Sequence, residues 1–310
     1  MDYYSALSKQ VEPVEMTPEA TSYFSKPVTG LDPRLFINGN LIPNVRNIIL
    51  AMLLNHLKLE YYGPESWMRA WLAGSAVSYQ WAADRDTPDL DCLVGLDYVQ
   101  FRASNPEYTG FSDREIASMF NENFRKNLNA QNFLDVFDIT FYVNVKSDIR
   151  DIKPYAAYSL TEDGWTVPPF EVEVQRNPMW EQVVQSDIEN AQEILKLYSE
   201  LVNKIKVAPN DAIRRNHEAL LKHVVEQGSA LFQDIHEKRS QAFTESGEGY
   251  YDFNNYRWQA GKRTGVVQAM KNLHNISKQS KKVFNEETYG LDLPDTSILI
   301  RRASTRPRYY

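Results

Sequence analysis

The apolar residues between positions 41 and 63 recur with the spacing of a helix. Pro43 suits the first helical turn, and Gly63 suits the point where the helix stops. The apolar positions on this helical period are Val45, Ile48, Ile49, Met52, Leu53 and Leu57. The pattern predicts an amphipathic helix that packs its apolar side on a sheet.

The next part of the chain has the pattern of strands. Residues 66–75 predict a strand that ends in a tight Gly-Ser turn, after which residues 76–82 can begin a helix. A polar loop at residues 83–88 leads to a second apolar run at residues 89–97. This run predicts a second strand.

A helix and further strands follow. Ser112, with Glu115 three residues later, has the signature of a capping box, which predicts a helix that begins there. Residues 133–145 alternate apolar and polar positions and are rich in β-branched and aromatic residues, which predicts a strand. Shorter strands are expected at residues 156–160 and around residues 165–174. Helices and strands alternate in this half, which indicates a sheet domain of the α/β or α+β class.

Long helical patterns dominate beyond Pro178. Residues 180–206 and 210–243 each predict a long helix, and a third helix is expected from residue 266 onward. A Gly-rich, aromatic stretch at residues 245–265 precedes that third helix. We therefore expect an α+β fold: a small mixed β-sheet with flanking helices, followed by an all-helical C-terminal domain.

These changes of pattern also predict the domain boundaries. Residues 1–30 are polar, contain Pro and have no clear period, so we expect an extended arm. Residues 31–177 are expected to form the sheet domain. Residues 178–310 are expected to form the helical domain with a basic C-terminal tail.

The charge of the chain limits the classes of partner. The net charge of −7 argues against broad electrostatic binding of nucleic acid, because a negative field repels phosphate. The distribution is uneven, since residues 255–310 carry eleven Lys or Arg and four Asp or Glu. This end of the chain can face phosphates locally, although a solvated basic tail is the commoner interpretation.

Targeting and metal-binding signals are sparse. The chain has no apolar run of the roughly 18 to 20 residues that span a bilayer, and its start lacks the order of a signal peptide, so a soluble cytoplasmic protein is expected. Cys92 is the single cysteine, which excludes an internal disulfide and a multi-cysteine zinc site. His217, His223 and His236 have no i, i+4 partner and are expected to be structural.

Two aspartates interrupt the apolar run at residues 89–97. On a strand, Asp89 and Asp91 point to one face, while Leu90 and Cys92 point to the packed face. Cys92 is therefore expected to be a buried small apolar residue and not a nucleophile. Two adjacent carboxylates repel unless a cation lies between them, and oxygen ligands favour Mg²⁺ or Mn²⁺.

The Gly-Ser turn supplies a complementary group for phosphate. Gly74 allows a close approach of the backbone, and backbone N–H groups after the turn, with the hydroxyl of Ser75, can hold a phosphate. The two parts of the motif, turn and carboxylates, are separated by a spacer of thirteen residues. Together they are hard to explain by folding alone.

This arrangement resembles the nucleotidyltransferase superfamily with the DNA polymerase β type of fold. The signature of that family is a hydrophobic residue, Gly, Gly or Ser, a spacer, and then Asp-hydrophobic-Asp-hydrophobic. The matching residues here are Ala73, Gly74, Ser75, Asp89, Leu90, Asp91 and Cys92, with a spacer at the long end of the family's range. The chain also resembles bacteriophage proteins of actinobacteria described as nucleotidyltransferases, in stretches such as LAGSAVSYQW and TFYVNV. If the protein is viral, the cytoplasm in which it is expected is that of the host cell.

The resemblance implies a third carboxylate on a later strand. Asp138, between Phe137 and Ile139, is preferred, and Asp135 is the alternative. Asp89, Asp91 and Asp138 would then bind two ions of Mg²⁺ or Mn²⁺ and transfer a nucleoside monophosphate from an NTP, such as ATP, with release of pyrophosphate. RNA or tRNA is one class of acceptor, and a small-molecule or protein hydroxyl is another. A catalytically silent protein that binds nucleotide or a partner also remains open.

The helical half offers candidates for binding the NTP. Arg257, Lys262 and Arg263 could meet the triphosphate, and Tyr250 or Trp258 could stack on a base. The alternative is a glycine turn followed by an aromatic anchor. Further basic residues on one long helix could also reach phosphates, but solvated charges explain them equally well; these are Arg214, Arg215 and Lys222.

Overall fold

The computed structural model describes residues 7, 10–81, 88–129, 131–171, 177–244 and 246–289. The chain divides into two compact units, and each of them is discontinuous in sequence. The sheet unit contains Ala20–Trp180 and Lys238–Gln259. The helical unit contains Met1–Glu19, Glu181–Glu237 and Ala260–Tyr310. Residues 238–259, which the sequence pattern places within a helical domain, therefore belong to the compact unit of the sheet.

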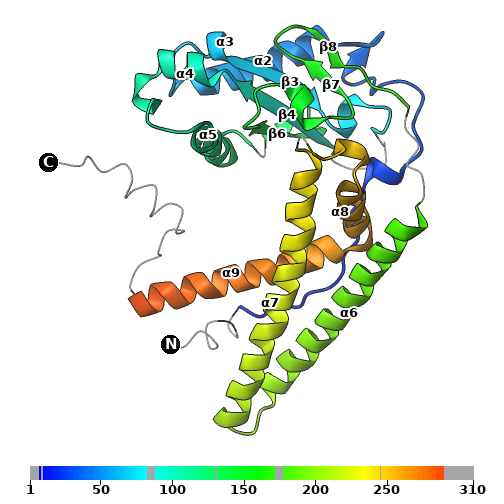
Figure 1. Ribbon diagram of the computed structural model, residues 1–310, viewed down its shortest axis with the longest axis vertical. Helices are drawn as coiled ribbons and strands as arrows, with labels where there is room; N and C mark the ends of the chain where they lie inside the picture. Colours follow the sequence, from blue (N-terminus) through cyan, green and yellow to red (C-terminus); the bar gives the residue numbers. More distant parts are fainter. Residues whose placement is uncertain are drawn as a thin grey trace, which may run out of the picture. The chain divides into compact units, whose positions relative to one another are not determined.

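A mixed sheet of six strands forms the centre of the sheet unit (Figure 1). The strand order is β5-β6-β4-β3-β7-β8, in which β4 and β6 are parallel and the other pairs are antiparallel. The strands are β3 (Met68–Ala73), β4 (Asp89–Leu96), β5 (Gln131–Phe133), β6 (Phe137–Val143), β7 (Ala157–Ser159) and β8 (Gly164–Val167). A separate hairpin is formed by β1 (Phe36–Ile37) and β2 (Asn40–Leu41). The predicted mixed sheet with helices, hence the α+β class, is confirmed.

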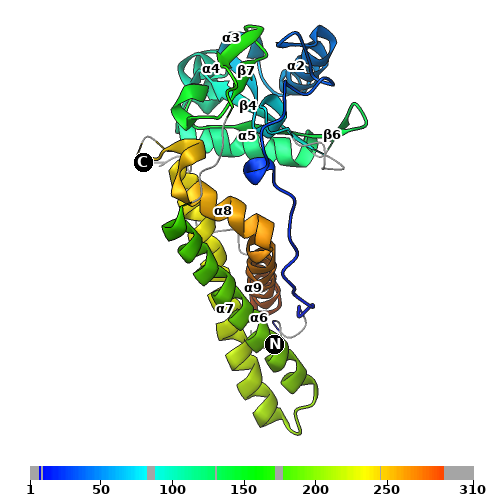
Figure 2. The same ribbon diagram turned by 90° about the vertical axis from the view of Figure 1, so that its right-hand side faces the viewer.

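Helices pack with the sheet around one apolar core. They are α2 (Pro43–Lys58), α3 (Pro64–Trp67), α4 (Tyr98–Ser104) and α5 (Asp113–Asn127), and Figure 2 shows α5 running along the sheet. The helix predicted from residue 43 is confirmed, with Val45, Ile49, Leu53 and Leu57 buried. Leu53 of α2, Phe120 of α5 and Ile139 of β6 all lie in this core. The apolar side of each helix is therefore used to cover the sheet.

Alternation of burial fixes the two faces of the central strands. In β6, Asp138 and Thr140 are exposed and their neighbours along the strand are buried. In β4, Leu90 and Cys92 are fully buried, as predicted, while Asp89 and Asp91 are exposed. Burial raises the pKa of the Cys92 thiol, which favours its neutral form.

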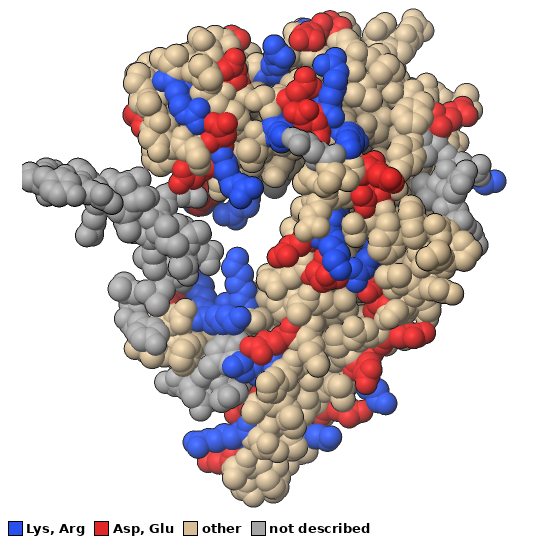
Figure 3. Space-filling view, in the orientation of Figure 1, with Lys and Arg blue, Asp and Glu red and all other residues tan. Residues whose placement is uncertain are grey.

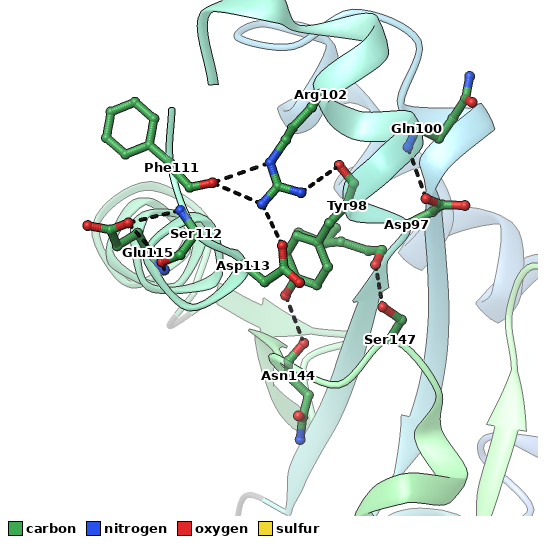
Figure 4. A network of polar contacts seen from close by, with 11 residues as sticks. Asp97, Tyr98, Gln100, Arg102, Phe111, Ser112, Asp113, Glu115, Asn144 and Ser147 are labelled. Atoms are coloured by element: carbon green, nitrogen blue, oxygen red, sulfur yellow. Dashed lines mark hydrogen bonds and ion pairs between the residues drawn. The ribbon is translucent and has the colours of Figure 1, made fainter. Parts of the chain in front are cut away.

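A polar network fixes the start of α5 (Figure 4). The Ser112 hydroxyl accepts a hydrogen bond from the Glu115 backbone N–H at 3.4 Å, and the Glu115 carboxylate accepts one from the Ser112 N–H at 2.9 Å. The predicted capping box is thus confirmed. Arg102 of α4 donates to the carbonyl oxygen of Phe111 at 2.9 Å and pairs with Asp113 at 2.5 Å. These bonds join α4 to the beginning of α5.

Two predicted elements differ from the structure. Residues 76–82 were expected to begin a helix, but the chain forms one 3₁₀ turn, η2 (Ser75–Val77), and Ser78 is extended. The Ser78 hydroxyl donates to the Ser75 carbonyl oxygen at 2.9 Å and accepts from the Gln80 N–H at 3.1 Å, which competes with helical bonding. The strand predicted at residues 133–145 is split by a turn, in which Leu134 and Asp135 have positive φ angles of 56° and 58°.

Other predictions concern regions that are described only in part. The short strands expected at residues 156–160 and around residue 165 correspond to β7 and β8. Most of the polar loop at residues 83–88 and the end of the second short strand, at residues 172–174, lie outside the described residues. The C-terminal part of the basic tail, at residues 290–310, also lies outside them.

Long helices build the helical unit. The predicted helices are confirmed as α6 (Pro178–Lys206), α7 (Asp211–Ala242) and α9 (Val266–Tyr289), of which α6 and α7 also reach into the sheet unit at one end. Within the unit, α7 and α9 pack closely at Gly228, where a Cβ atom would lie 2.3 Å from Cδ1 of Leu273. A further helix, α8 (Phe253–Thr264), occupies the stretch that was expected to be a Gly-rich separator. Among the described residues, none of the helices combines the length and apolar character needed to cross a bilayer.

Candidate functional site

Three strands of the sheet unit bring the two parts of the sequence motif to one end of the sheet. Ala73, the last residue of β3, lies opposite Asp91 of β4 in an antiparallel pair. Asp89 of β4 lies opposite Asp138 of β6 in a parallel pair. The Gly-Ser turn follows β3 directly, and the carboxylates lie at the starts of β4 and β6. The topology therefore gathers these groups at one place.

The turn itself fits the carboxylate beside it. Gly74 has a φ angle of +84° and a ψ angle of −163°, a conformation that is essentially restricted to glycine. A Cβ atom at Gly74 would lie 2.8 Å from Oδ2 of Asp91. Glycine is thus required twice, by the backbone conformation and by the space that the Asp91 carboxylate occupies.

The predicted carboxylates share one face of two neighbouring strands. Asp89, Asp91 and Asp138 are all exposed, and Thr140 lies opposite Asp91. Asp135, the alternative third carboxylate, lies in the turn between β5 and β6. The backbone register therefore favours Asp138 over Asp135 as the neighbour of Asp89.

The arrangement of possible metal ligands can be examined over the described side chains. In the part of the chain that the structure describes, no three His, Cys, Asp or Glu side chains are grouped closely enough to hold a metal ion. The strand register places Asp89 opposite Asp138 at this end of the sheet.

An arginine that sequence analysis missed lies near the carboxylates. The guanidinium of Arg239, in α7, lies 5.0 Å from the ring centroid of Trp258 and 5.8 Å from that of Phe243. Its Nε atom is buried and has no hydrogen-bond partner among the described residues. Burial lowers the pKa of Arg239, and the negative charge of Asp91 opposes this shift. Arg239 is therefore a largely desolvated cation within electrostatic range of Asp91.

Arg239 carries no signal in the sequence that could have identified it. Lys238 and Arg239 lie in a long amphipathic helix, in which a basic pair normally indicates a solvated face. The position of Arg239 near Asp91 is a result of tertiary structure, because residues 238–259 return to the sheet unit. Trp258, one of the two residues that could stack on a base, has the guanidinium of Arg239 over its ring.

Tyr250 has the role of an aromatic anchor. Its ring stacks on Tyr155 at 4.8 Å, and its hydroxyl donates a hydrogen bond to the side chain of Gln80, which is itself buried. Tyr23 donates a hydrogen bond to the Tyr250 carbonyl oxygen at 3.2 Å. Burial, with smaller contributions from neighbouring tyrosines, raises the pKa of the Tyr250 hydroxyl. The structure thus favours the anchoring alternative over base stacking for this residue.

The other candidates for nucleotide binding fall in different surroundings. Arg257 is 7% exposed and belongs to the sheet unit, whereas Lys262 and Arg263 belong to the helical unit. Lys262 forms an ion pair with Glu19 at 3.0 Å. Two of the further basic residues also pair on their own helix, Arg214 with Asp211 and Lys222 with Glu226. Such pairs are the expected state of solvated charges.

Comparisons with known proteins do not assign this protein to a family, so its class is described by its fold and its candidate site. No model of a protein family matches the chain, and no curated protein or solved structure matches it. The molecule is an α+β protein in which a glycine turn and aspartates of neighbouring parallel strands meet at one end of a six-stranded mixed sheet.

Proposed function

We propose that this protein is a metal-dependent nucleotidyltransferase, which moves a nucleoside monophosphate from an NTP to a hydroxyl group and releases pyrophosphate. The observation that carries the proposal is the close approach of Gly74 to the carboxylate of Asp91, beside the pair Asp89 and Asp138. A turn that can hold phosphate next to carboxylates that can hold a divalent ion is what this transfer requires. The sequence signature and the topology support the same assignment.

A divalent cation fits the donor chemistry of this edge of the sheet. Carboxylate oxygens are the ligands that Mg²⁺ and Mn²⁺ prefer, and Asp89, Asp91 and Asp138 share the exposed face of β4 and β6. The resemblance to the superfamily suggests two ions. When bound, such ions lower the pKa of the attacking hydroxyl and neutralise charge on the leaving pyrophosphate.

The residues of the chain have separate roles in the proposed reaction. The glycine turn and the Ser75 hydroxyl bind a phosphate of the NTP. The acceptor oxygen forms a bond to the α-phosphorus, the bond from that phosphorus to its bridging oxygen breaks, and pyrophosphate leaves. A carboxylate oxygen of Asp138 takes the proton of the acceptor hydroxyl. Arg239 supplies a positive charge whose field acts on Asp91.

The proposed acceptor is a hydroxyl of RNA or tRNA, and a small-molecule or protein hydroxyl is the alternative. On the face shown in Figure 3, acidic and basic side chains are interspersed over the described residues. Such a mixed surface, with a net charge of −7 for the chain, suits a local contact with an acceptor better than broad binding of nucleic acid.

A catalytically silent nucleotide-binding protein is the second candidate. The observation that favours it is the buried guanidinium of Arg239 near Asp91, together with the spread of the carboxylate side chains among the described residues. A fixed cation beside an acidic group can stabilise that group without a metal ion. In this case the protein binds NTP and transfers nothing.

Labelled nucleotides decide between the two candidates. Each NTP, labelled at the α-phosphate, is incubated with the protein, Mg²⁺ or Mn²⁺, and either total RNA or a protein fraction. We expect label in one acceptor and release of pyrophosphate, both abolished by EDTA. The variant Asp91→Asn should lose more than about a hundredfold in rate, because even a change in the outer shell of a metal site costs about 10- to 100-fold.

The control is a substitution of Asp97, the residue that directly follows β4. Asp97 caps α4 and lies at the opposite end of β4 from Asp91, so Asp97→Asn should keep the rate. Binding of NTP without transfer would contradict the enzyme and support the silent protein. If neither binding nor transfer occurs with either metal, both candidates are wrong.

A further inference from the structure

A small hollow in the sheet unit adjoins the proposed site. Its walls include Ser22, Asp32, Arg34, Ser75, Trp81 and Pro88. Ser75 follows the glycine of the turn, and Pro88 directly precedes Asp89. The hollow therefore lies next to both parts of the motif, and a segment N-terminal to the sheet supplies its charged residues.

Arg34 is held firmly in this hollow by a buried carboxylate. Nε of Arg34 donates to Oδ1 and Oδ2 of Asp32 at 2.9 and 3.1 Å, and Nη2 donates to Oδ2 at 2.6 Å. Asp32 is 1% exposed, and its Oδ1 also accepts from the backbone N–H of Arg34 at 2.9 Å. A bidentate pair on a buried carboxylate fixes both the position and the plane of the guanidinium.

Aromatic rings fix the guanidinium from other directions. Cζ of Arg34 lies 4.8 Å from the ring centroid of Phe137 and 5.8 Å from that of Trp81. The Trp81 ring is itself held, because its Nε1 donates to the carbonyl oxygen of Gly30 at 3.0 Å. Phe137 directly precedes Asp138 on β6. Arg34 thus lies beside the ring of the first residue of β6, directly before Asp138 in sequence.

One edge of the guanidinium is open. Asp32 uses Nε and Nη2 of Arg34, whereas Nη1 makes no hydrogen bond to any described residue. The side chain is 39% exposed, so solvent or a ligand reaches it. The hydrogen bonds that Arg34 donates to Asp32 raise the pKa of Arg34, which keeps its charge. A charged, pre-oriented arginine with a free edge is suited to phosphate recognition.

We propose that Arg34 binds a phosphate group of the NTP together with the Ser75 hydroxyl, on the side of the glycine turn that faces the hollow. The inference rests on the proposed function and names a binding residue that lies outside the sequence signature. Asp91 adjoins Gly74 and Arg34 shares the hollow with Ser75, so the turn has an anionic group at one residue and a cationic group at the next. Asp32 is then a positioning residue, which holds Arg34 toward the ligand.

The test measures binding of inorganic triphosphate and of Mg²⁺–ATP to the full chain by isothermal titration calorimetry. For Arg34→Gln we expect the dissociation constant of each ligand to rise about tenfold or more, since a charge-assisted hydrogen bond is lost. Arg34→Lys, which keeps the charge but loses the planar fork, should give a smaller rise. In the transfer assay, the KM for NTP should rise while kcat changes less than about threefold.

The matched control is Arg46→Gln. Arg46 is also partly buried and donates to the carbonyl oxygen of Leu160 at 2.7 Å, but it does not line the hollow. This variant should bind triphosphate as the wild type does. Thermal unfolding of all three variants separates a loss of ligand from a loss of fold. If Arg34→Gln does not fold, the folded Arg34→Lys variant decides.

Each outcome separates this inference from the proposed function. Unchanged triphosphate binding by folded Arg34 variants overturns the subsite, even if the wild type transfers nucleotide. Weaker binding by these variants supports the subsite, even if the wild type transfers nothing and the proposed reaction falls. A wild-type protein that binds no triphosphate overturns the subsite directly.

Discussion

The two ends of β4 place carboxylates in opposite circumstances. At the C-terminal end, Asp97 accepts a hydrogen bond from the Gln100 N–H at 2.9 Å and so caps α4 (Figure 4). Beside it, the Ser147 hydroxyl donates to the carbonyl oxygen of Leu96 at 2.6 Å. At the N-terminal end, Asp89 faces another acid, Asp138, across a parallel pair. One end has the complementary partners of a structural network, and the other brings like charges together.

This difference separates the polar groups that stabilise the fold from those that are candidates for function. A structural carboxylate lies where a donor needs an acceptor, as Asp97 does at the start of α4. Like charges on adjacent strands are destabilising, so a cation at this end of the sheet would stabilise the arrangement. The positive charge of Arg239 acts on Asp91, and the proposed metal ions would act in the same sense.

The largest effect is expected from the third carboxylate. Asp138→Asn should lower the transfer rate more than about a hundredfold, because it removes a proposed metal ligand and proton acceptor. Asp135→Asn, in the adjacent turn, should keep the rate within about threefold. Steady-state kinetics of both variants make the measurement, with circular dichroism as the test of folding. The reverse result would assign the third ligand to Asp135.

The next effect is expected from the glycine of the turn. Gly74→Ala should lower both the transfer rate and the free energy of unfolding, the latter by about 1–3 kcal/mol, since alanine disfavours the backbone conformation. Its Cβ would also press on Oδ2 of Asp91. Urea denaturation and the transfer assay measure the two losses. A variant of normal stability and normal rate would show that the close approach at Gly74 has no importance.

The smallest effect on activity is expected at the other end of the strand. Arg102→Ala removes the bonds to Phe111 and Asp113, and should lower the free energy of unfolding by about 1–3 kcal/mol. The rate of transfer per folded molecule should stay unchanged. Chemical denaturation followed by tryptophan fluorescence measures the stability. A large loss of rate in a folded Arg102→Ala protein would contradict the division between the two ends.

Local sequence patterns predicted much of the sheet unit. The capping box of Ser112 and Glu115, the burial of Leu90 and Cys92, and the helix that begins at Pro43 are each set by neighbours in sequence. The aspartates of the motif could be located because alternation along a strand decides which face they occupy. These features depend on residues that are close in sequence, so a local pattern is enough to predict them.

The features that were missed depend on contacts between distant residues. The helix α8 contains Gly261, and a glycine usually indicates a break in a helix. A Cβ atom at this position would lie 2.8 Å from Cγ2 of Val267, so the glycine allows close packing. Arg239 and Arg34 each lie near the motif through tertiary structure, and neither has a motif of its own. Hydrogen bonding by Ser78 ended the expected helix after one turn, which composition alone does not reveal.

The discontinuity of the sheet unit has a consequence for its biosynthesis. Tyr250, which stacks on Tyr155 and accepts a hydrogen bond from Tyr23, lies in the late segment Lys238–Gln259. The ribosome makes that segment after the whole of Glu181–Glu237, so the tyrosine contacts cannot form while the nascent chain is shorter. The strands of the sheet are therefore all synthesised before the segment that completes their unit, and Tyr155 and Tyr23 gain their contacts with Tyr250 only at a late stage of translation.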